Sequence, residues 1–160
     1  MIKKNIIKNN LVSHGSSSLK GIITPPGDKS ISHRALLFSS LALGKSEISN
    51  LLHSEDVLNM VKALKLLGIK ITKINNIFYV IGSGLTGFNI PDKHIDCGNS
   101  GTLARILIGA IGGSEIFVTL TGDESLRTRP MNRVIKPLEK MGINFHSSNG
   151  LLPLIVYGTN

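Results

Sequence analysis

Residues 58–71 read LNMVKALKLLGIKI, and residues 132–145 read NRVIKPLEKMGINF. Placed one above the other, 74 positions apart, the two stretches share apolar positions, a glycine and the isoleucine after it. A second pair, GDKSISHRALL at 27–37 and GNSGTLARILI at 98–108, aligns 71 positions apart and shares its first glycine and an arginine. Self-similarity of this kind predicts two structural units of roughly 70 residues with one plan.

The first unit has the pattern of a strand, a helix, a strand, a helix and two strands. Apolar residues recur with helical spacing after Ser54, a typical N-cap, and stop at Gly68, a typical residue just past a helix end. Asn75-Asn76 is a turn signal between two short apolar runs. We therefore expect strands at 22–24 and 46–49, helices at 30–43 and 55–67, and strands at 69–74 and 77–81.

The second unit should repeat this βαβαββ order across 95–160, which makes the chain an α/β protein. We divide the chain into an N-terminal segment at 1–20 that packs loosely, a first unit at 21–92 and a second unit at 93–160.

The composition is that of a folded, basic protein. The chain has 160 residues, of which 41% are hydrophobic, and a net charge of +8. This is enough apolar material for a real core. The positive charge fits nucleic acid, an anionic membrane or small anionic substrates equally well. With 4% aromatic residues and no tryptophan, platforms for stacking single-stranded nucleic acid are scarce.

Several classes of protein are disfavoured by single features. Cys97 is the only cysteine, which rules out an internal disulfide and a cysteine-based zinc site and fits a reducing cytosol. The five histidines show no ligand spacing, so we expect no metal. The basic start has no apolar signal core, and no run approaches about 18 apolar residues. We expect a cytoplasmic protein without a membrane span.

Arginine is concentrated in three segments, 25–37, 96–108 and 122–133, which hold all five arginines of a chain with 13 lysines. The planar guanidinium binds carboxylates and phosphates through two parallel hydrogen bonds, which lysine cannot do. Lys29 stands at a predicted helix start, where a cation is unfavourable unless an anion is bound. The segments therefore predict an anion site. The helix that follows has an apolar face formed by Ile31, Ala35, Phe38 and Ala42.

The cations also have a structural interpretation. Lys29 is then an ordinary exposed lysine, and Arg105 and Arg133 pair with Asp96 or Asp123 to hold the repeats together. Because each alternative explains one residue at a time, the concentration of arginine in three short segments favours the anion site.

Four other residues have supporting roles in this interpretation. Asp28 caps or orients its neighbours, as does Asp123 in the third segment. His33 is a core histidine or one that supports a binding residue. Cys97 is a packing residue at a strand end, since no histidine base is near it in sequence.

At these residues the chain resembles a known family. PGDKSISHRALL, GNSGT and GDESLRTRPMNR followed by PLEKMGI are similar to the N-terminal domain of the 5-enolpyruvylshikimate-3-phosphate synthases, enolpyruvyl transferases of the shikimate pathway. The resemblance covers nearly all of 19–158. It implies an inside-out α/β barrel, in which each of two domains contains three βαβαββ units and the active site lies between the domains. The two repeats then correspond to two units of one domain.

The resemblance also implies roles for the basic residues. Lys29 matches the lysine that contacts both phosphoenolpyruvate and shikimate 3-phosphate. Ser30 and Arg34 match the pair that holds the shikimate part, and Arg129 matches the arginine that binds phosphoenolpyruvate. By this match Lys29 and Arg129 are the catalytic candidates.

The GNSGT match implies that Asn99, Gly101 and Thr102 belong to the loop against phosphoenolpyruvate. Family members with glycine at the position of Gly101 leave room for the inhibitor glyphosate, whereas a methyl group would crowd it. The resemblance therefore implies a glyphosate-sensitive pocket in the complete enzyme.

By resemblance, the reaction moves the enolpyruvyl group onto the 5-hydroxyl of shikimate 3-phosphate by addition and elimination, and it releases phosphate without a metal or other cofactor. Family members are well over twice as long as this chain. We expect the third unit and the second domain to be absent and the chain to be inactive alone. A complementary C-terminal chain is then a candidate partner, and the surface that the missing unit would cover should be apolar.

Three alternatives remain open. UDP-N-acetylglucosamine enolpyruvyl transferases share the fold, but they have asparagine where this chain has Ser30, and their reactive cysteine is not matched by Cys97 in context. The second alternative is a non-catalytic remnant that binds anions or a partner chain. The third is a protein that binds duplex nucleic acid through its backbone, with the salt dependence that such binding shows.

Overall fold

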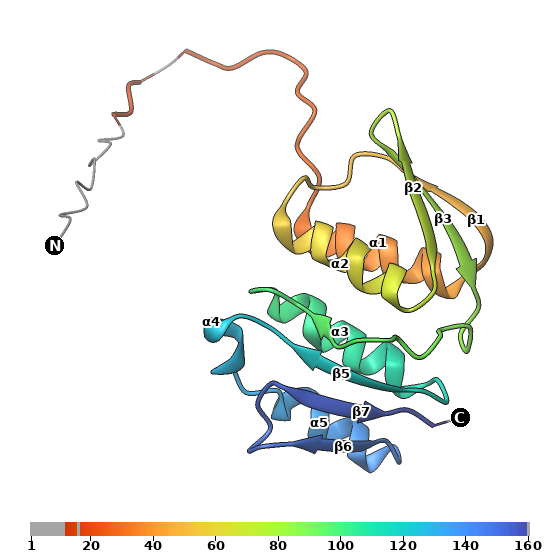
Figure 1. Ribbon diagram of the computed structural model, residues 1–160. Helices are drawn as coiled ribbons and strands as arrows, with labels where there is room; N and C mark the ends of the chain where they lie inside the picture. The colour runs from red at the N-terminus through yellow and green to blue at the C-terminus, as the bar shows by residue number, and fades with distance from the viewer. Residues whose placement is uncertain (1–11, 16, 160) are drawn as a thin grey trace, which may run out of the picture.

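The computed structural model of the protein describes residues 12–15 and 17–159 and contains two helix-and-sheet layers, one above the other (Figure 1). The first layer contains α1 (Lys29–Leu41), β1 (Leu43–Ile48), α2 (Glu55–Leu66), β2 (Lys70–Ile74) and β3 (Ile77–Ser83). The second contains β4 (Ile95–Asp96), α3 (Gly101–Gly112), β5 (Phe117–Thr121), α4 (Glu124–Arg127), α5 (Asn132–Lys140), β6 (Asn144–Ser147) and β7 (Leu154–Tyr157). No helix in this described part is long and apolar enough to cross a bilayer.

Both layers use the same strand order. The first sheet has the order β1-β3-β2 and is antiparallel throughout. The second has the order β4-β5-β7-β6, in which only the short β4 runs parallel to its neighbour. The arrangement β1-β3-β2 is thus repeated as β5-β7-β6, with α1 packed on β3 and α3 packed on β5 and β7. The predicted α/β fold and its internal repeat are confirmed.

The strand predicted at 22–24 is wrong. Ile22 and Ile23 are 101% and 88% exposed, and their segment leads away from α1 (Figure 1). A lone extended segment has no neighbour for its backbone amides and carbonyls, so apolar, β-branched residues alone do not make a strand. Of the segment 1–20 that was predicted to pack loosely, residues 1–11 and 16 lie outside the described residues.

Predictions from local sequence signals are confirmed. The Ser54 hydroxyl accepts a hydrogen bond from the Val57 amide at 3.4 Å, which caps α2. Gly68 has φ +91°, in the region that glycine favours after a helix. Asn75 and Asn76 have φ of +48° and +64°, as the tight turn between β2 and β3 requires. These features depend on neighbours in sequence, which is why the sequence predicts them well.

The core runs through both layers. The apolar residues that recur after Ser54 are buried: Val57, Met60, Val61 and Leu64 in α2, and Leu67 directly after it. Leu36 from α1 and Leu103 and Leu107 from α3 are fully buried in the same cluster. Because α1 packs against both α2 and α3, this core joins the two layers.

The orientation of α1 is opposite to the prediction. Ile31 and Phe38, from the predicted apolar face, are 60% and 62% exposed, whereas His33 and Ser40 are fully buried. The buried polar groups are satisfied by hydrogen bonds: the Ser40 hydroxyl donates to the Leu36 carbonyl at 2.8 Å. The apolar side chains Ile31 and Phe38 of α1 therefore form a surface that the described residues do not cover.

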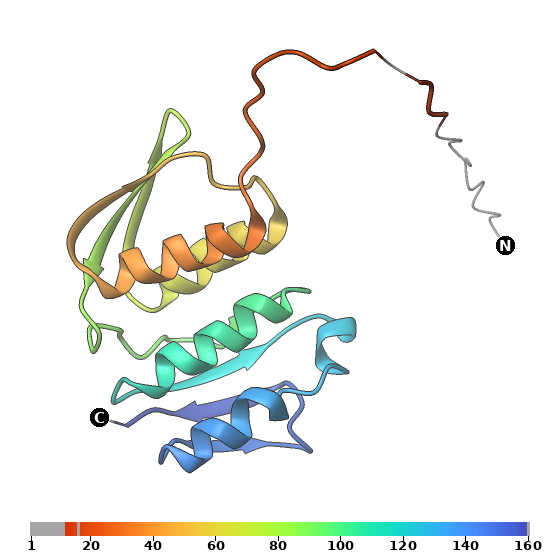
Figure 2. The ribbon, with the colours of Figure 1, turned by 180° about the vertical axis from the view of Figure 1, so that it is seen from behind.

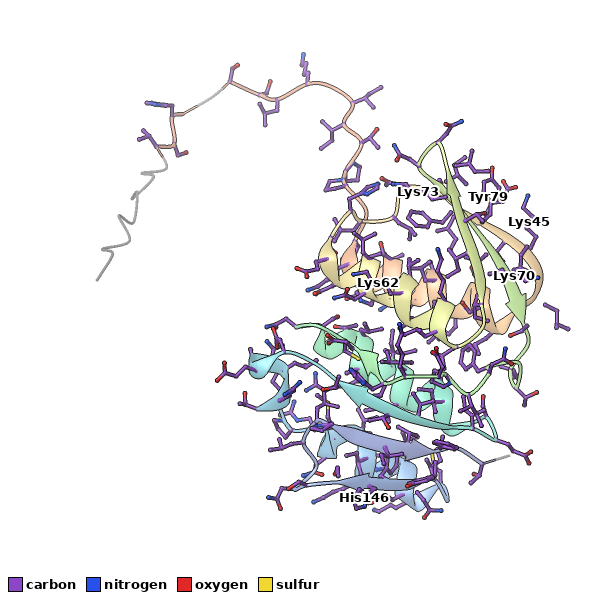
Figure 3. All side chains as sticks on the ribbon, in the orientation of Figure 1. Lys45, Lys62, Lys70, Lys73, Tyr79 and His146 are labelled. Carbon is purple, nitrogen blue, oxygen red and sulfur yellow. The ribbon has the colours of Figure 1, made fainter. Side chains whose placement is uncertain are left out.

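The open edge of the first sheet carries charged side chains. In the described part of the chain β1 pairs only with β3, whereas the corresponding β5 has β4 on its other side. On β1, Lys45 Nζ lies 3.3 Å from Glu47 Oε1. The same ammonium lies 4.3 Å from the centroid of the Tyr79 ring on β3 (Figure 3).

Candidate functional site

The starts of the helices gather at one end of the molecule. Figure 2 shows α1, α3 and α5 beginning on the same side, where α4 also lies. Each helix start has unpaired amides and the positive end of the helix dipole. This end of the molecule is therefore suited to anions, and all three arginine-containing segments contribute to it.

His33 joins the two repeats at this end. Its Nδ1 lies 2.7 Å from the Lys29 carbonyl oxygen, which can only accept, so Nδ1 carries the proton. Its Nε2 lies 3.4 Å from the hydroxyl of Ser100, the N-cap of α3. The start of α1 is thereby tied to the loop before α3. The prediction of a core or supporting histidine is confirmed, because His33 is fully buried.

Lys29 is held in place rather than free. Its Nζ lies 2.8 Å from Oδ2 of Asp56, in the first turn of α2. Asp28 caps the same helix start by accepting from the Ile31 amide at 2.7 Å, as expected. The contact with Asp56 is not predictable from local sequence, since the two residues are 27 positions apart. Lys29 is an exposed lysine, as the structural interpretation expects, but its ammonium is paired with an acid.

Ser30 and Arg34 lie on the first turns of α1. Ser30 is half-buried and Arg34 is exposed. In the part of the chain that the structure describes, neither side chain has a hydrogen bond or ion pair. Their polar groups are therefore available to a ligand.

The GNSGT loop is fixed by its own side chains. Gly98 has φ +56°, and its amide donates to Oδ1 of Asp96 at 2.8 Å. Ser100 caps α3 by accepting from the Leu103 amide at 3.3 Å. Thr102 follows, half-buried, on the first turn of α3. A rigid loop in front of a helix start can present its amides to a ligand with little reorganisation.

Asn99 and Arg129 form the centre of the second repeat's site. Asn99 Nδ2 donates to Oδ2 of Asp123 at 2.7 Å, which leaves the amide oxygen of Asn99 directed to the guanidinium of Arg129. Arg129 also donates to the Ser125 hydroxyl at 3.1 Å. Nη1 of Arg129 donates to the Asn99 carbonyl at 3.5 Å as well. All three acceptors are neutral, so the positive charge of Arg129 is not cancelled by a directly bonded carboxylate.

Asp123 has the supporting role that was expected of it. Its other oxygen accepts from the Leu126 amide at 2.7 Å and caps α4. This backbone hydrogen bond, followed by the Asn99 hydrogen bond and the charges of Arg129 and Arg127, holds the pKa of Asp123 below its ordinary value of 3.8. Asp123 is therefore a carboxylate at neutral pH and orients Asn99.

Gly101 lies between two guanidinium groups. A Cβ at this position would lie 2.7 Å from Nη1 of Arg105 and 3.6 Å from Nη1 of Arg129. The absence of a side chain therefore allows both arginines to approach the start of α3. An alanine at this position would push the Arg105 side chain aside.

The predicted pairing of Arg105 and Arg133 with aspartates is wrong. Arg105 donates to the carbonyls of Gly101 and Pro130, each at 3.3 Å. The carboxylates of Asp96 and Asp123 are instead used by nearby amides. Neither Arg105 nor Arg133 forms an ion pair with an acid of the described residues. Together they line a cavity of about 480 Å³, formed by Arg105, Arg129, Pro130 and Arg133.

Cys97 is a packing residue, as predicted. It is fully buried in the core directly after β4. Burial, assisted by the charge of Asp96, raises the pKa of its thiol to about 12. A thiol of this kind stays protonated and unreactive at neutral pH.

The predicted site residues thus form two adjoining groups. The first group consists of Lys29, Ser30 and Arg34 on α1. The second group contains Gly101 and Arg129. The contact between His33 and Ser100 connects them.

The comparisons with known proteins agree on one family. A family model described as EPSP synthase (3-phosphoshikimate 1-carboxyvinyltransferase) matches residues 13–160. Curated proteins named 3-phosphoshikimate 1-carboxyvinyltransferase are similar, including one from Afipia carboxidovorans, 47% identical over 92% of this chain, and one from Thermodesulfovibrio yellowstonii, 45% identical over 93%. The chain spans about a third of their length, 34% and 35% respectively.

A solved structure gives the same result for the fold. The EPSP synthase from Acinetobacter baumannii superposes with a TM-score of 0.81 at 35% sequence identity. The match covers 91% of this chain and 34% of that one.

Proposed function

Because the chain belongs to the EPSP synthase family, we propose that it supplies part of the active site for transfer of the enolpyruvyl group from phosphoenolpyruvate to the 5-hydroxyl of shikimate 3-phosphate. The remaining part of the site is supplied by the region that corresponds to the other two thirds of these relatives, present in the same protein or in a complementary chain. The protein acts in the cytoplasm, in the shikimate pathway that leads to aromatic amino acids.

The observation that carries this proposal is the arrangement of Arg129, Asn99 and Gly101. Arg129 is oriented by neutral partners, and its Nη1 lies 3.6 Å from the Cβ position of Gly101 at the start of α3. Groups oriented before the substrate arrives can stabilise charge in a transition state at low reorganisation cost. A substrate with a phosphate and a carboxylate, such as phosphoenolpyruvate, suits such a site.

The proposed roles follow the two groups of residues. Lys29 contacts both substrates, and Ser30 and Arg34 bind shikimate 3-phosphate. Because an ammonium carries protons that it can donate, Lys29 is also the candidate for proton transfer.

In the second group, Arg129 binds phosphoenolpyruvate, with Asn99, Gly101 and Thr102 lining its position. Arg129 holds its charge throughout the reaction, which suits stabilisation of the tetrahedral intermediate. The parts 21–92 and 93–160 act as two units of one domain, and each contributes one of these groups.

The test is release of inorganic phosphate from phosphoenolpyruvate and shikimate 3-phosphate. The chain is assayed alone and as an assembled enzyme, that is, mixed with a polypeptide covering the remaining part of the Afipia carboxidovorans relative. We expect turnover only in the assembled enzyme. Replacing shikimate 3-phosphate by UDP-N-acetylglucosamine should abolish it.

The matched control is the corresponding N-terminal third of the relative, mixed with the same polypeptide. If this control turns over and the assembled enzyme does not, the proposed activity is wrong. Turnover by the chain alone would contradict the proposal of a shared site.

A further inference from the structure

We propose that Arg105 and Arg133 form, beside Arg129, a second oxyanion site that takes a phosphate-type dianion. The site is the cavity lined by Arg105, Arg129, Pro130 and Arg133. It lies between α3 and α5, which pack against each other. It adjoins the Arg129 position proposed for phosphoenolpyruvate but uses two arginines that have no part in that proposal.

The charge balance of the cavity points to an anion. None of its lining residues is acidic. Nη1 of Arg105 and Nη1 of Arg129 both lie within 4 Å of the same point, the Cβ position at Gly101. Like charges held this close repel, and the described residues place no carboxylate in an ion pair with Arg105 or Arg133. A bound dianion would remove this repulsion.

The start of α5 adds to the positive potential. Met131, its N-cap, makes no side-chain hydrogen bond to the helix, and the first turn contains no acidic residue. In α2, by contrast, Ser54 caps the helix and Glu55 and Asp56 occupy the first turn. Arg133 therefore places a cation at an uncapped helix start, an arrangement that is favourable only with an anion nearby.

Arg105 has the geometry of a fixed anion receptor. Two of its guanidinium nitrogens donate to the carbonyls of Gly101 and Pro130 at 3.3 Å, which sets the plane of the group. A guanidinium has five N–H donors, so further donors remain for a ligand. Arg133 is exposed and has no partner in the described part of the chain, so it can close over a ligand held by Arg105.

A phosphate dianion is the ligand class that fits two planar guanidinium groups best, since each can form paired hydrogen bonds to its oxygens. The physiological role rests on the proposed function. A reaction that releases phosphate next to Arg129 would have a receiving site directly beside it. The same cavity could otherwise hold the phosphate group of incoming phosphoenolpyruvate.

The experiment titrates inorganic phosphate into the 160-residue chain and follows the arginine Nε–Hε signals by NMR. We expect saturable shifts at Arg105 and Arg133. The variant Arg133→Gln should weaken phosphate binding about fivefold or more. The control Lys136→Gln removes the same charge from the exposed side of α5 and should change the affinity less than twofold.

Two results would overturn the site: absence of saturable shifts at Arg105, or equal weakening by Arg133→Gln and Lys136→Gln, which indicates only a general charge effect. Arg105→Lys keeps the charge but loses the planar fork, and it should also weaken binding. A parallel titration with phosphoenolpyruvate identifies the ligand. Shifts at Arg105 and Arg133 with phosphate but not with phosphoenolpyruvate support a receiving site, and stronger shifts with phosphoenolpyruvate support an entry site.

Phosphate binding is measured without turnover, so the two proposals can fail separately. If the assembled enzyme is inactive and phosphate still binds at Arg105 and Arg133, only the proposed function is wrong. If the assembled enzyme is active and Arg133→Gln leaves phosphate binding unchanged, only the second site is wrong.

Discussion

His33 Nε2 lies 3.4 Å from the hydroxyl of Ser100, so a histidine of the first repeat bonds to the residue that caps a helix of the second. The hydrogen bonds run in series. The Leu103 amide donates to the Ser100 hydroxyl, the hydroxyl donates to Nε2, and Nδ1 donates to the Lys29 carbonyl. The two groups of site residues are thereby held at a fixed separation.

His33→Ala should destabilise the fold. The change removes a buried ring, breaks two hydrogen bonds and leaves the Ser100 hydroxyl without an acceptor, for a loss of about 3 kcal/mol. Urea denaturation measures it. His146→Ala, at an exposed histidine on β6, is the control and should change stability by less than about 0.5 kcal/mol (Figure 3). Equal losses of unfolding free energy in the two variants would show that the contact between His33 and Ser100 does not stabilise the fold.

Asp123→Asn should change how stability depends on pH. The pKa of Asp123 is lower in the folded chain than its ordinary 3.8, so its stabilising contribution is present above the unfolded value and is lost as pH falls through the folded value. The difference in unfolding free energy between wild type and variant should be constant from about pH 5 to 7 and shrink below about pH 4.

The measurement is urea denaturation at a series of pH values. Glu139→Gln, which removes an exposed acid from α5, is the control. A difference between wild type and Asp123→Asn that stays constant down to about pH 2 would contradict the role of the carboxylate.

Lys29→Ala and Arg129→Ala should each lower kcat/KM of the assembled enzyme. The expected loss of transition-state stabilisation is about 3 kcal/mol, the contribution of one oriented hydrogen-bond donor. Lys45→Ala is a matched control, because Lys45 is also a surface lysine paired with an acid. It should leave the rate unchanged. A loss below about tenfold for both site variants would contradict their proposed roles.

Gly101→Ala should lower sensitivity of the assembled enzyme to glyphosate about tenfold, equivalent to about 1.4 kcal/mol. The added methyl group would lie 2.7 Å from Nη1 of Arg105, so that guanidinium must move. Gly109→Ala is the control, since a Cβ there has no neighbour within 4 Å and lies on the same helix. Unchanged inhibition by Gly101→Ala would rule out the steric explanation.

Local features were predictable from the sequence because their causes lie within a few residues. The Ser54 cap, the Gly68 termination and the Asn75-Asn76 turn each follow from backbone preferences of those residues. The repeat predicted that the two units share one sequence of helices and strands for the same reason, since both copies carry similar local signals.

Features that depend on distant partners were missed or wrong. The segment at 22–24 has strand-forming residues but no neighbouring strand in the described part of the chain. The alternative in which Arg105 pairs with an aspartate is wrong, because nearby amides already occupy the carboxylates of Asp96 and Asp123. Asp56 carried no signal as the partner of Lys29, because only folding brings α2 beside the start of α1.

Within residues 12–15 and 17–159, one side of β1 has no paired strand, and this bears on contacts between copies of the molecule. An exposed β-strand offers backbone groups to any passing chain and is a common starting point for aggregation. Lys45 and Glu47 place charge of both signs along that strand, and Gly44, with φ +91°, interrupts its regular extension. Pairing of β1 with the same strand of another copy is thereby disfavoured. A strand whose charges complement Lys45 and Glu47 can still pair with it.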